Sequence, residues 1–132
     1  MIAIDLGSNS LRMIQRDCDQ KRFTGEYEKI VKTAELLHSE GIISEASIQR
    51  ILEGFKEASC IFDFKNEACV AVTTEAMRRA SNSQEALERI DKETGVAFEI
   101  IGAKKEAERT LLAVDRRLET LGFRGSYLLI DI

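Results

Sequence analysis

The chain has 132 residues, of which 44% are hydrophobic and 32% charged, a composition typical of a globular protein. Its net charge of −4 excludes the broad basic surface of a nucleic-acid-binding domain, and no apolar run reaches the roughly 18 residues of a membrane-spanning helix. The single histidine, His38, gives no support to a histidine-centred metal site or a Ser-His-Asp triad. Three cysteines without metal-type spacing indicate reduced thiols, so we expect a cytoplasmic protein without a signal peptide.

The first apolar stretch, residues 1–6, predicts a buried strand that runs into an acid and a tight turn. Asp5 would lie at the carboxyl end of this strand, where a buried carboxylate needs a cation or hydrogen-bond donors. After a glycine, Ser8, Asn9 and Ser10 offer hydroxyls, an amide and backbone N–H groups with little bulk. Such a turn suits a phosphate whose charge is shared with a divalent ion. The alternative is an ordinary tight hairpin between two strands.

Two more strands are predicted at residues 11–16 and 23–32, and with the first they describe an antiparallel meander. Residues 34–43 form a connection without a clear period. Ser44 is predicted to cap a helix whose apolar residues recur at helical spacing and which ends near residues 64–66.

Helices and apolar strands alternate in the second half of the chain. Residues 68–73 predict an internal strand, and a short helical segment follows it. The spacing of Ser81 and Gln84 predicts a capping box for the next helix, which ends at Gly95. A further strand is predicted at residues 96–101.

The last predicted helix lies between Gly102 and Gly122, and its apolar residues mark one packing stripe. A final apolar strand is predicted at residues 127–132, after a domain boundary near residues 122–125. The order β-β-β-α-β-α-β-α-β indicates an α/β fold with a mixed sheet and helices on both faces.

Five short motifs, in this order along the chain, resemble those of the exopolyphosphatase and guanosine pentaphosphate phosphohydrolase (Ppx/GppA) family. The first is Asp-Leu-Gly-Ser-Asn-Ser, with Arg12 following closely. The others are Gly-Ile-Ile-Ser-Glu, Ala-Val-Thr-Thr-Glu-Ala-Met-Arg, Ile-Ile-Gly-x-x-x-Glu-Ala and Leu-Leu-Ile-Asp-Ile, at residues 41–45, 71–78, 100–107 and 128–132. Each motif is modest alone, whereas the ordered set is specific.

The resemblance implies the fold of the actin-like ATPase superfamily, a ribonuclease H-like lobe with a mixed five-stranded sheet and helices on both faces. Residues 1–124 would form the first lobe, and residues 125–132 would be the opening strand of a second lobe that is otherwise absent. We therefore expect this chain to be the N-terminal part of a longer enzyme and to be inactive alone. Without partner strands, residues 127–132 should be disordered, folded back, or paired with another molecule.

The implied activity is hydrolysis of the terminal phosphoanhydride bond of inorganic polyphosphate, of guanosine pentaphosphate, or of both. Mg²⁺ or another divalent cation is the implied cofactor. The implied ligands are polyphosphate or (p)ppGpp, with neither DNA nor a membrane as partner, and the full-length protein would be a homodimer.

By the same resemblance, Ser8, Asn9 and Ser10 would bind phosphate, and Asp5 and Asp131 would lie near the metal from opposite lobes. Glu106 would be the general base that orients and deprotonates the attacking water, in the first turn of a helix that favours its ionised form.

Thr74 and Arg78 would line the substrate channel, with Arg78 pairing to a phosphate. Two alternatives remain open at this stage: Glu106 could only stabilise its helix, and Arg78 could be an ordinary surface arginine. The chain departs from the family pattern at Lys104 and Lys105 and at residues 35–37, where the family has a glycine-rich loop. The second departure weakens any inference about substrate contacts at residues 32–40.

Two other functions stay open from the sequence. One is a phosphotransferase, such as a sugar or acetate kinase, on the same scaffold. The other is a non-catalytic module that senses (p)ppGpp or polyphosphate.

Overall fold

The structure, a computed structural model, describes residues 1–130, and its first strands follow from alternating apolar residues. In β1 (Ile2–Leu6) every second side chain, beginning with Ile2, is buried, whereas Ala3 and Asp5 lie on the opposite, exposed face. β2 (Ser10–Asp17) and β3 (Arg22–Ile30) continue as antiparallel neighbours, which confirms the predicted meander.

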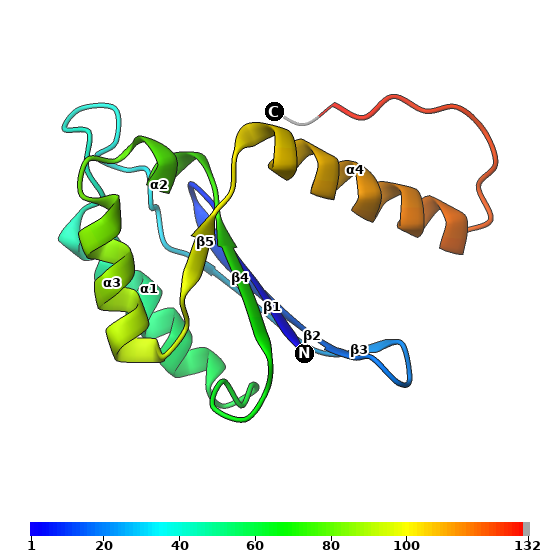
Figure 1. Ribbon diagram of the computed structural model, residues 1–132, viewed down its shortest axis with the longest axis horizontal. Helices are drawn as coiled ribbons and strands as arrows, with labels where there is room; N and C mark the ends of the chain where they lie inside the picture. Colours follow the sequence, from blue (N-terminus) through cyan, green and yellow to red (C-terminus); the bar gives the residue numbers. More distant parts are fainter. Residues whose placement is uncertain (131–132) are drawn as a thin grey trace. The chain divides into compact units, whose positions relative to one another are not determined.

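The sheet is mixed because the later strands pair in parallel. β4 (Cys69–Thr73) lies beside β1, and β5 (Phe98–Ile100) lies beside β4, so the order is β3-β2-β1-β4-β5 (Figure 1). In this register Leu6 is opposite Thr73, so β1 and β4 end at the same edge of the sheet. The predicted mixed five-stranded sheet with helices is confirmed.

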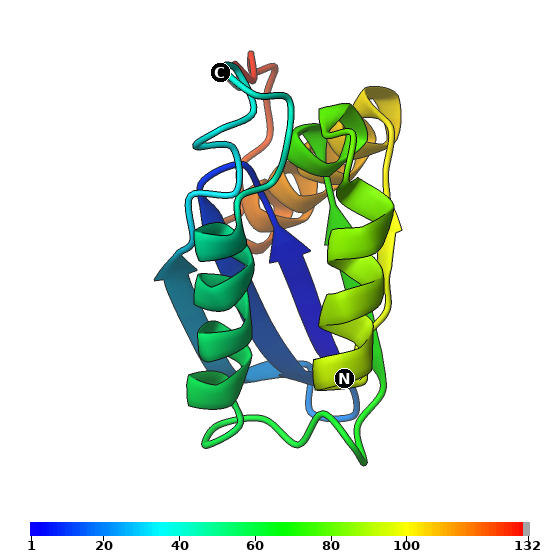
Figure 2. The ribbon, with the colours of Figure 1, turned by 90° about the vertical axis from the view of Figure 1, so that its left-hand side faces the viewer.

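Helices α1 (Glu45–Ala58) and α3 (Ser83–Thr94) lie side by side across one face of this sheet, as Figure 2 shows. Their apolar faces meet the buried side of the strands in one hydrophobic core. Its fully buried members include Ile2, Ile4, Leu6, Leu11, Met13, Ile51 and Ile90. The short α2 (Glu75–Arg79) follows β4 directly.

Helix α1 begins as the sequence predicts and ends earlier. The Ser44 hydroxyl accepts the N–H of Ser47, so the predicted N-cap is confirmed. The predicted end near residues 64–66 is wrong, because the N–H groups of Ile61 and Phe62 both turn back to the Ala58 carbonyl at 2.9 Å. Phe62 is buried without being helical, and this extended the apolar period beyond the helix.

The predicted capping box at Ser81 and Gln84 is also wrong. Helix α3 starts at Ser83, and Asn82 occupies the N-cap position without a side-chain capping bond. The Asn82 amide instead pairs with the backbone of Ile43, accepting its N–H at 2.8 Å and donating to its carbonyl at 2.9 Å. The predicted stop at Gly95 is confirmed by its left-handed φ of 74°.

The chain divides into two compact units, Met1–Ile101 and a second that starts at Gly102. The second unit contains α4 (Ala103–Thr120), followed by Gly122 at φ 73°. The expected packing stripe is not buried: no residue of α4 is buried, and Leu111 is 45% exposed. No helix in residues 1–130 has the length and apolar content needed to cross a membrane.

The predicted strand at residues 127–132 does not form in its described part, residues 127–130. This segment runs back beside α4 (Figure 1), and the phenol of Tyr127 donates a hydrogen bond to the Asp115 carboxylate. That bond raises the pKa of Tyr127. The expectation of a folded-back segment therefore fits residues 127–130.

Candidate functional site

The turn between β1 and β2 is a two-residue hairpin loop closed by a hydrogen bond from the Gly7 N–H to the Ser10 carbonyl at 3.0 Å. Ser8 and Asn9 form its tip and are exposed, while Ser10 starts β2 and is half-buried. The segment is therefore a tight hairpin turn, and this geometry is also compatible with a phosphate-binding loop.

The carbonyl oxygens of the tip are bound by the segment that follows β3. Asn9 O accepts the N–H groups of Val31 and Lys32, and Ser8 O accepts the N–H of Ala34, each at 2.9 Å. Within residues 1–130, Ser8 and Asn9 donate no hydrogen bond through backbone or side chain. The backbone carbonyls of the tip are thus engaged within the protein, whereas the donors of its two exposed residues are not engaged by the described chain, an arrangement that suits an anion.

The end of β4 lies beside this turn. The Thr73 hydroxyl donates to the Leu6 carbonyl at 2.8 Å and fastens the two strand ends together. Thr74 comes next and is 8% exposed, and its side chain makes no capping bond to α2. Asp5 lies two residues before Gly7, on the face of the sheet opposite α1 and α3.

Arg78 lies on α2, and its Nη1 donates a hydrogen bond to the Ile101 carbonyl, just after β5. Arg78 thus connects α2 to the last strand of the sheet. Its role toward a phosphate stays a prediction.

Six of the predicted site residues belong to the first unit: Asp5, Ser8, Asn9, Ser10, Thr74 and Arg78. Glu106 belongs to the second unit, in the first turn of α4, where its N–H bonds to the Gly102 carbonyl at 3.0 Å. Asp131 lies outside the described residues.

No motif indicates that residues 31–34 support the turn. Lys32 has a left-handed φ of 51°, which is uncommon for a residue other than glycine, and no residue pattern announces it. Thr33 is fully buried, and its hydroxyl has no hydrogen-bond partner within the described chain.

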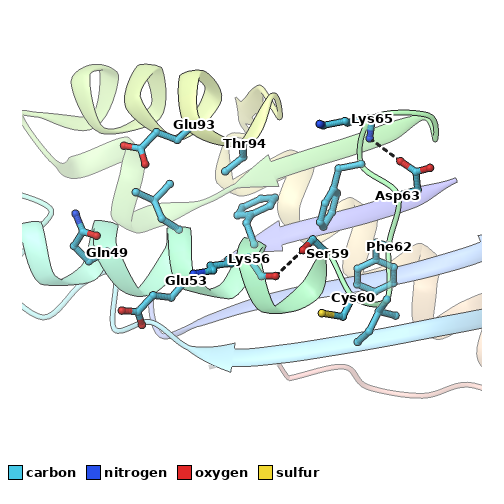
Figure 3. A pocket seen from close by; sticks show the side chains of 14 residues that line it. Gln49, Glu53, Lys56, Ser59, Cys60, Phe62, Asp63, Lys65, Glu93 and Thr94 are labelled. Carbon is cyan, nitrogen blue, oxygen red and sulfur yellow. Dashed lines mark hydrogen bonds between the residues drawn. The ribbon is translucent and has the colours of Figure 1, made fainter.

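A cavity of about 840 Å³ lies elsewhere in the first unit, between the end of α1, the loop after it and the end of α3 (Figure 3). This loop leads to Ala68, whose carbonyl accepts the Ile2 N–H at the start of β1, whereas the turn follows the end of β1. The labelled side chains carry both signs of charge: Lys56 and Lys65 are positive, and Glu53, Asp63 and Glu93 are negative. Such a mixed lining does not suit a polyanion, so the turn is the better candidate.

A sequence model of the Ppx/GppA phosphatase family matches residues 13–132. The chain belongs to the Ppx/GppA phosphatase family. Exopolyphosphatase 1 of Mycobacterium tuberculosis is 28% identical to it over 117 residues, which are 86% of this chain and 34% of that protein. Exopolyphosphatase 1 of Mycobacterium leprae is 27% identical over the same length.

Solved structures of Ppx/GppA proteins share the fold. The crystal structure of the Aquifex aeolicus family member superposes with a TM-score of 0.73 at 34% identity, covering 86% of this chain and 38% of that one. An exopolyphosphatase from Cytophaga hutchinsonii superposes with a TM-score of 0.72 at 27% identity, covering 81% and 35%. This chain therefore spans about a third of the length of these Ppx/GppA relatives.

The side chains of the first unit supply only part of the ligand set that a hard divalent cation needs. No group of three or more His, Cys, Asp or Glu side chains gathers within residues 1–130. Asp5 supplies carboxylate oxygens beside the turn. Mg²⁺ commonly takes one or two protein carboxylates and completes its shell with water and substrate phosphates, so Asp5 fits such a role.

Proposed function

We propose that the full-length protein hydrolyses the terminal phosphoanhydride bond of inorganic polyphosphate or guanosine pentaphosphate. Membership of the Ppx/GppA phosphatase family supports this reaction class. The observation that carries the proposal is the exposed turn at Ser8 and Asn9, whose backbone carbonyls are bound by residues 31–34 and whose donors bind no other described residue. The phosphate oxygens of either substrate are hydrogen-bond acceptors, so they complement the donors of this tip.

In this proposal Ser8, Asn9 and Ser10 bind the terminal phosphate, and Thr74 adds a hydroxyl from the neighbouring strand end. Arg78 contributes positive charge from α2. Hydrolysis of a phosphoanhydride depends mainly on such positioning and on charge neutralisation.

Asp5 and Asp131 would hold a divalent cation, directly or through water. When bound, that ion supplies charge neutralisation to the phosphate oxygens. The full-length protein is proposed to be a homodimer, as the family resemblance implies.

Glu106 is proposed as the general base. A water oxygen attacks the terminal phosphorus, the bond from that phosphorus to the bridging oxygen breaks, and the Glu106 carboxylate takes the proton of the water. Its place in the first turn of α4 supports this role, because a helix N-terminus stabilises the ionised carboxylate.

The test uses the full-length protein with Mg²⁺ and measures phosphate release from both substrates. Glu106→Gln should lower kcat by roughly 10²- to 10⁴-fold while the melting temperature is kept. Glu108→Gln is the matched control, because Glu108 lies on the same helix, exposed, and pairs with Lys104 at 3.9 Å.

Unchanged turnover in Glu106→Gln would remove Glu106 from the mechanism. Phosphoryl transfer to an acceptor without transfer to water would identify a kinase instead, and tight binding of (p)ppGpp without turnover would identify a sensing module. Either outcome would overturn the proposed hydrolysis.

A further inference from the structure

The segment that grips the turn is itself held by side chains of α1. Ser47 Oγ donates to the Lys32 carbonyl at 2.7 Å, and Arg50 Nε donates to the Val31 carbonyl at 2.9 Å. Both carbonyls belong to the stretch whose N–H groups bind Ser8 and Asn9. Side chains of α1 are therefore linked to the tip of the first hairpin through the backbone of residues 31 and 32.

The Arg50 bond and the turn share a single peptide group. The Val31 carbonyl and the Lys32 N–H are the two ends of one peptide unit, of which the carbonyl accepts Arg50 Nε and the N–H donates to Asn9 O. Hydrogen bonds in such a chain polarise and strengthen one another. The peptide plane, and with it the position of Asn9, is fixed from the helix side by the guanidinium.

Arg50 is fixed in turn by a carboxylate. Its Nη2 lies 2.7 Å from Glu35 Oε1 and 3.0 Å from Ser47 Oγ, and the two charged side chains are 29% and 28% exposed. Ser44, the N-cap residue, donates its hydroxyl to the same Glu35 oxygen. The bonds from Ser44 and Arg50 hold the pKa of Glu35 below its ordinary value, so the carboxylate is ionised at neutral pH.

We propose that Arg50, anchored by Glu35, is a positioning residue that sets the geometry of the phosphate-binding turn without touching the substrate. The expected effect of Arg50 on turnover rests on the proposed function. Its effect on the position of the turn rests on the hydrogen-bond chain alone. The fork of the guanidinium is essential, because its Nε and Nη2 must serve Val31 and Glu35 at the same time. It also explains how Lys32 is kept at its left-handed φ.

The test compares Arg50→Met with Arg89→Met in the full-length protein. Arg89, on α3, is a matched control because it pairs with Glu45 of α1 at 2.7 Å and has a similar exposure of 36%. Among the described residues it bonds only Glu45 and Glu93. Two quantities are measured: kcat and KM for polyphosphate, and amide hydrogen exchange at Val31, Lys32 and Ala34.

Arg50→Met should lower kcat/KM on the order of 10- to 100-fold, since a small displacement of a positioning group costs this much. Exchange at Lys32 should become faster in Arg50→Met and stay at the wild-type rate in Arg89→Met. If Arg50→Met does not fold, Arg50→Lys carries the same comparison, because it keeps the charge beside Glu35 and loses the fork.

Wild-type exchange at Lys32 together with a kcat/KM equal to that of Arg89→Met would overturn the proposal. The two proposals can fail separately. A wild-type protein without hydrolase activity would refute the proposed function, whereas faster exchange confined to the Arg50 variant would still support the positioning role.

Discussion

The buried hydroxyl of Thr33 is the least expected single group in the structure. It lies between Lys32 and Ala34, which both bind the turn, and no described residue satisfies it. A buried polar atom without a partner is a cost to the folded state. Its neighbours Val31, Lys32 and Ala34 offset this cost through their hydrogen bonds to the tip and to α1.

Replacing Thr33 by valine should stabilise the protein by up to about 1 kcal/mol, because the shape is kept and the unsatisfied group is removed. Thermal or urea unfolding of Thr33→Val against wild type measures this. A loss of stability of that size would show that the hydroxyl has a partner, such as a bound water.

Individual residues were predictable where a local rule decided their conformation. Ser44 caps α1 and Gly95 ends α3, as their residue types indicate. Ser81 has an equally suitable side chain but does not cap α3. Its N–H and hydroxyl both donate to the Gly41 carbonyl, 40 residues earlier. No local rule contains such a long-range partner.

At the scale of elements, β3 and α1 are joined by a polar contact at their exposed rim. The Glu57 carboxylate accepts hydrogen bonds from Lys29 Nζ and from the Tyr27 hydroxyl, each at 2.5 Å. These bonds, that of Lys29 first, hold the pKa of Glu57 below its ordinary value of 4.5. The contact therefore stabilises the fold above that pH and is lost as the pH falls through the lower, folded pKa.

Glu57→Gln should accordingly lower the melting temperature at pH 7, and the difference from wild type should shrink well below pH 4.5. Melting curves over this range test the sign. Glu53→Gln is the control, since Glu53 meets the same Lys29 at the longer distance of 3.6 Å and should have a smaller effect. A change in melting temperature in Glu57→Gln that does not depend on pH would contradict a stabilising role of the ionised carboxylate.

The strands were predictable because their apolar residues alternate or run together, and the pairing of β1 with β2 follows from a short turn. The end of α1 was not, because the core face of the helix continues into Phe62 after the helix has stopped. Helix α4 shows the converse: its apolar residues recur at helical spacing, yet none of its residues is buried by the described part of the chain.

At the scale of the whole molecule, each unit exposes apolar surface. In the first unit, Ile14, Val70 and Ile100, on strands of the sheet, are 40–49% exposed, and in the second unit Leu111 and Leu112 are 45% and 49% exposed. The aligned part of this chain covers only 34–38% of the length of its Ppx/GppA relatives. The division into a first lobe at residues 1–124 and an opening strand at 125–132 stays a proposal, as does the facing phosphate loop of a second lobe.

We expect residues 1–132 alone to release no measurable phosphate from polyphosphate, because under the proposed division into lobes they would supply one side of a two-sided site. The assay compares equal concentrations of this chain and the full-length protein with Mg²⁺, with circular dichroism to verify folding. Turnover by a folded 132-residue chain would show that one lobe suffices.

The bonding at Asn9 also bears on which ions can settle at the hairpin tip. Its carbonyl oxygen accepts two N–H groups, which uses both lone pairs. A sodium or potassium ion that sheds its hydration shell would therefore find no replacement oxygen in that peptide unit. An alkali counterion that travels with a polyanion thus gains no backbone ligand from Asn9, and any oxygen ligand from this residue has to come from its side chain.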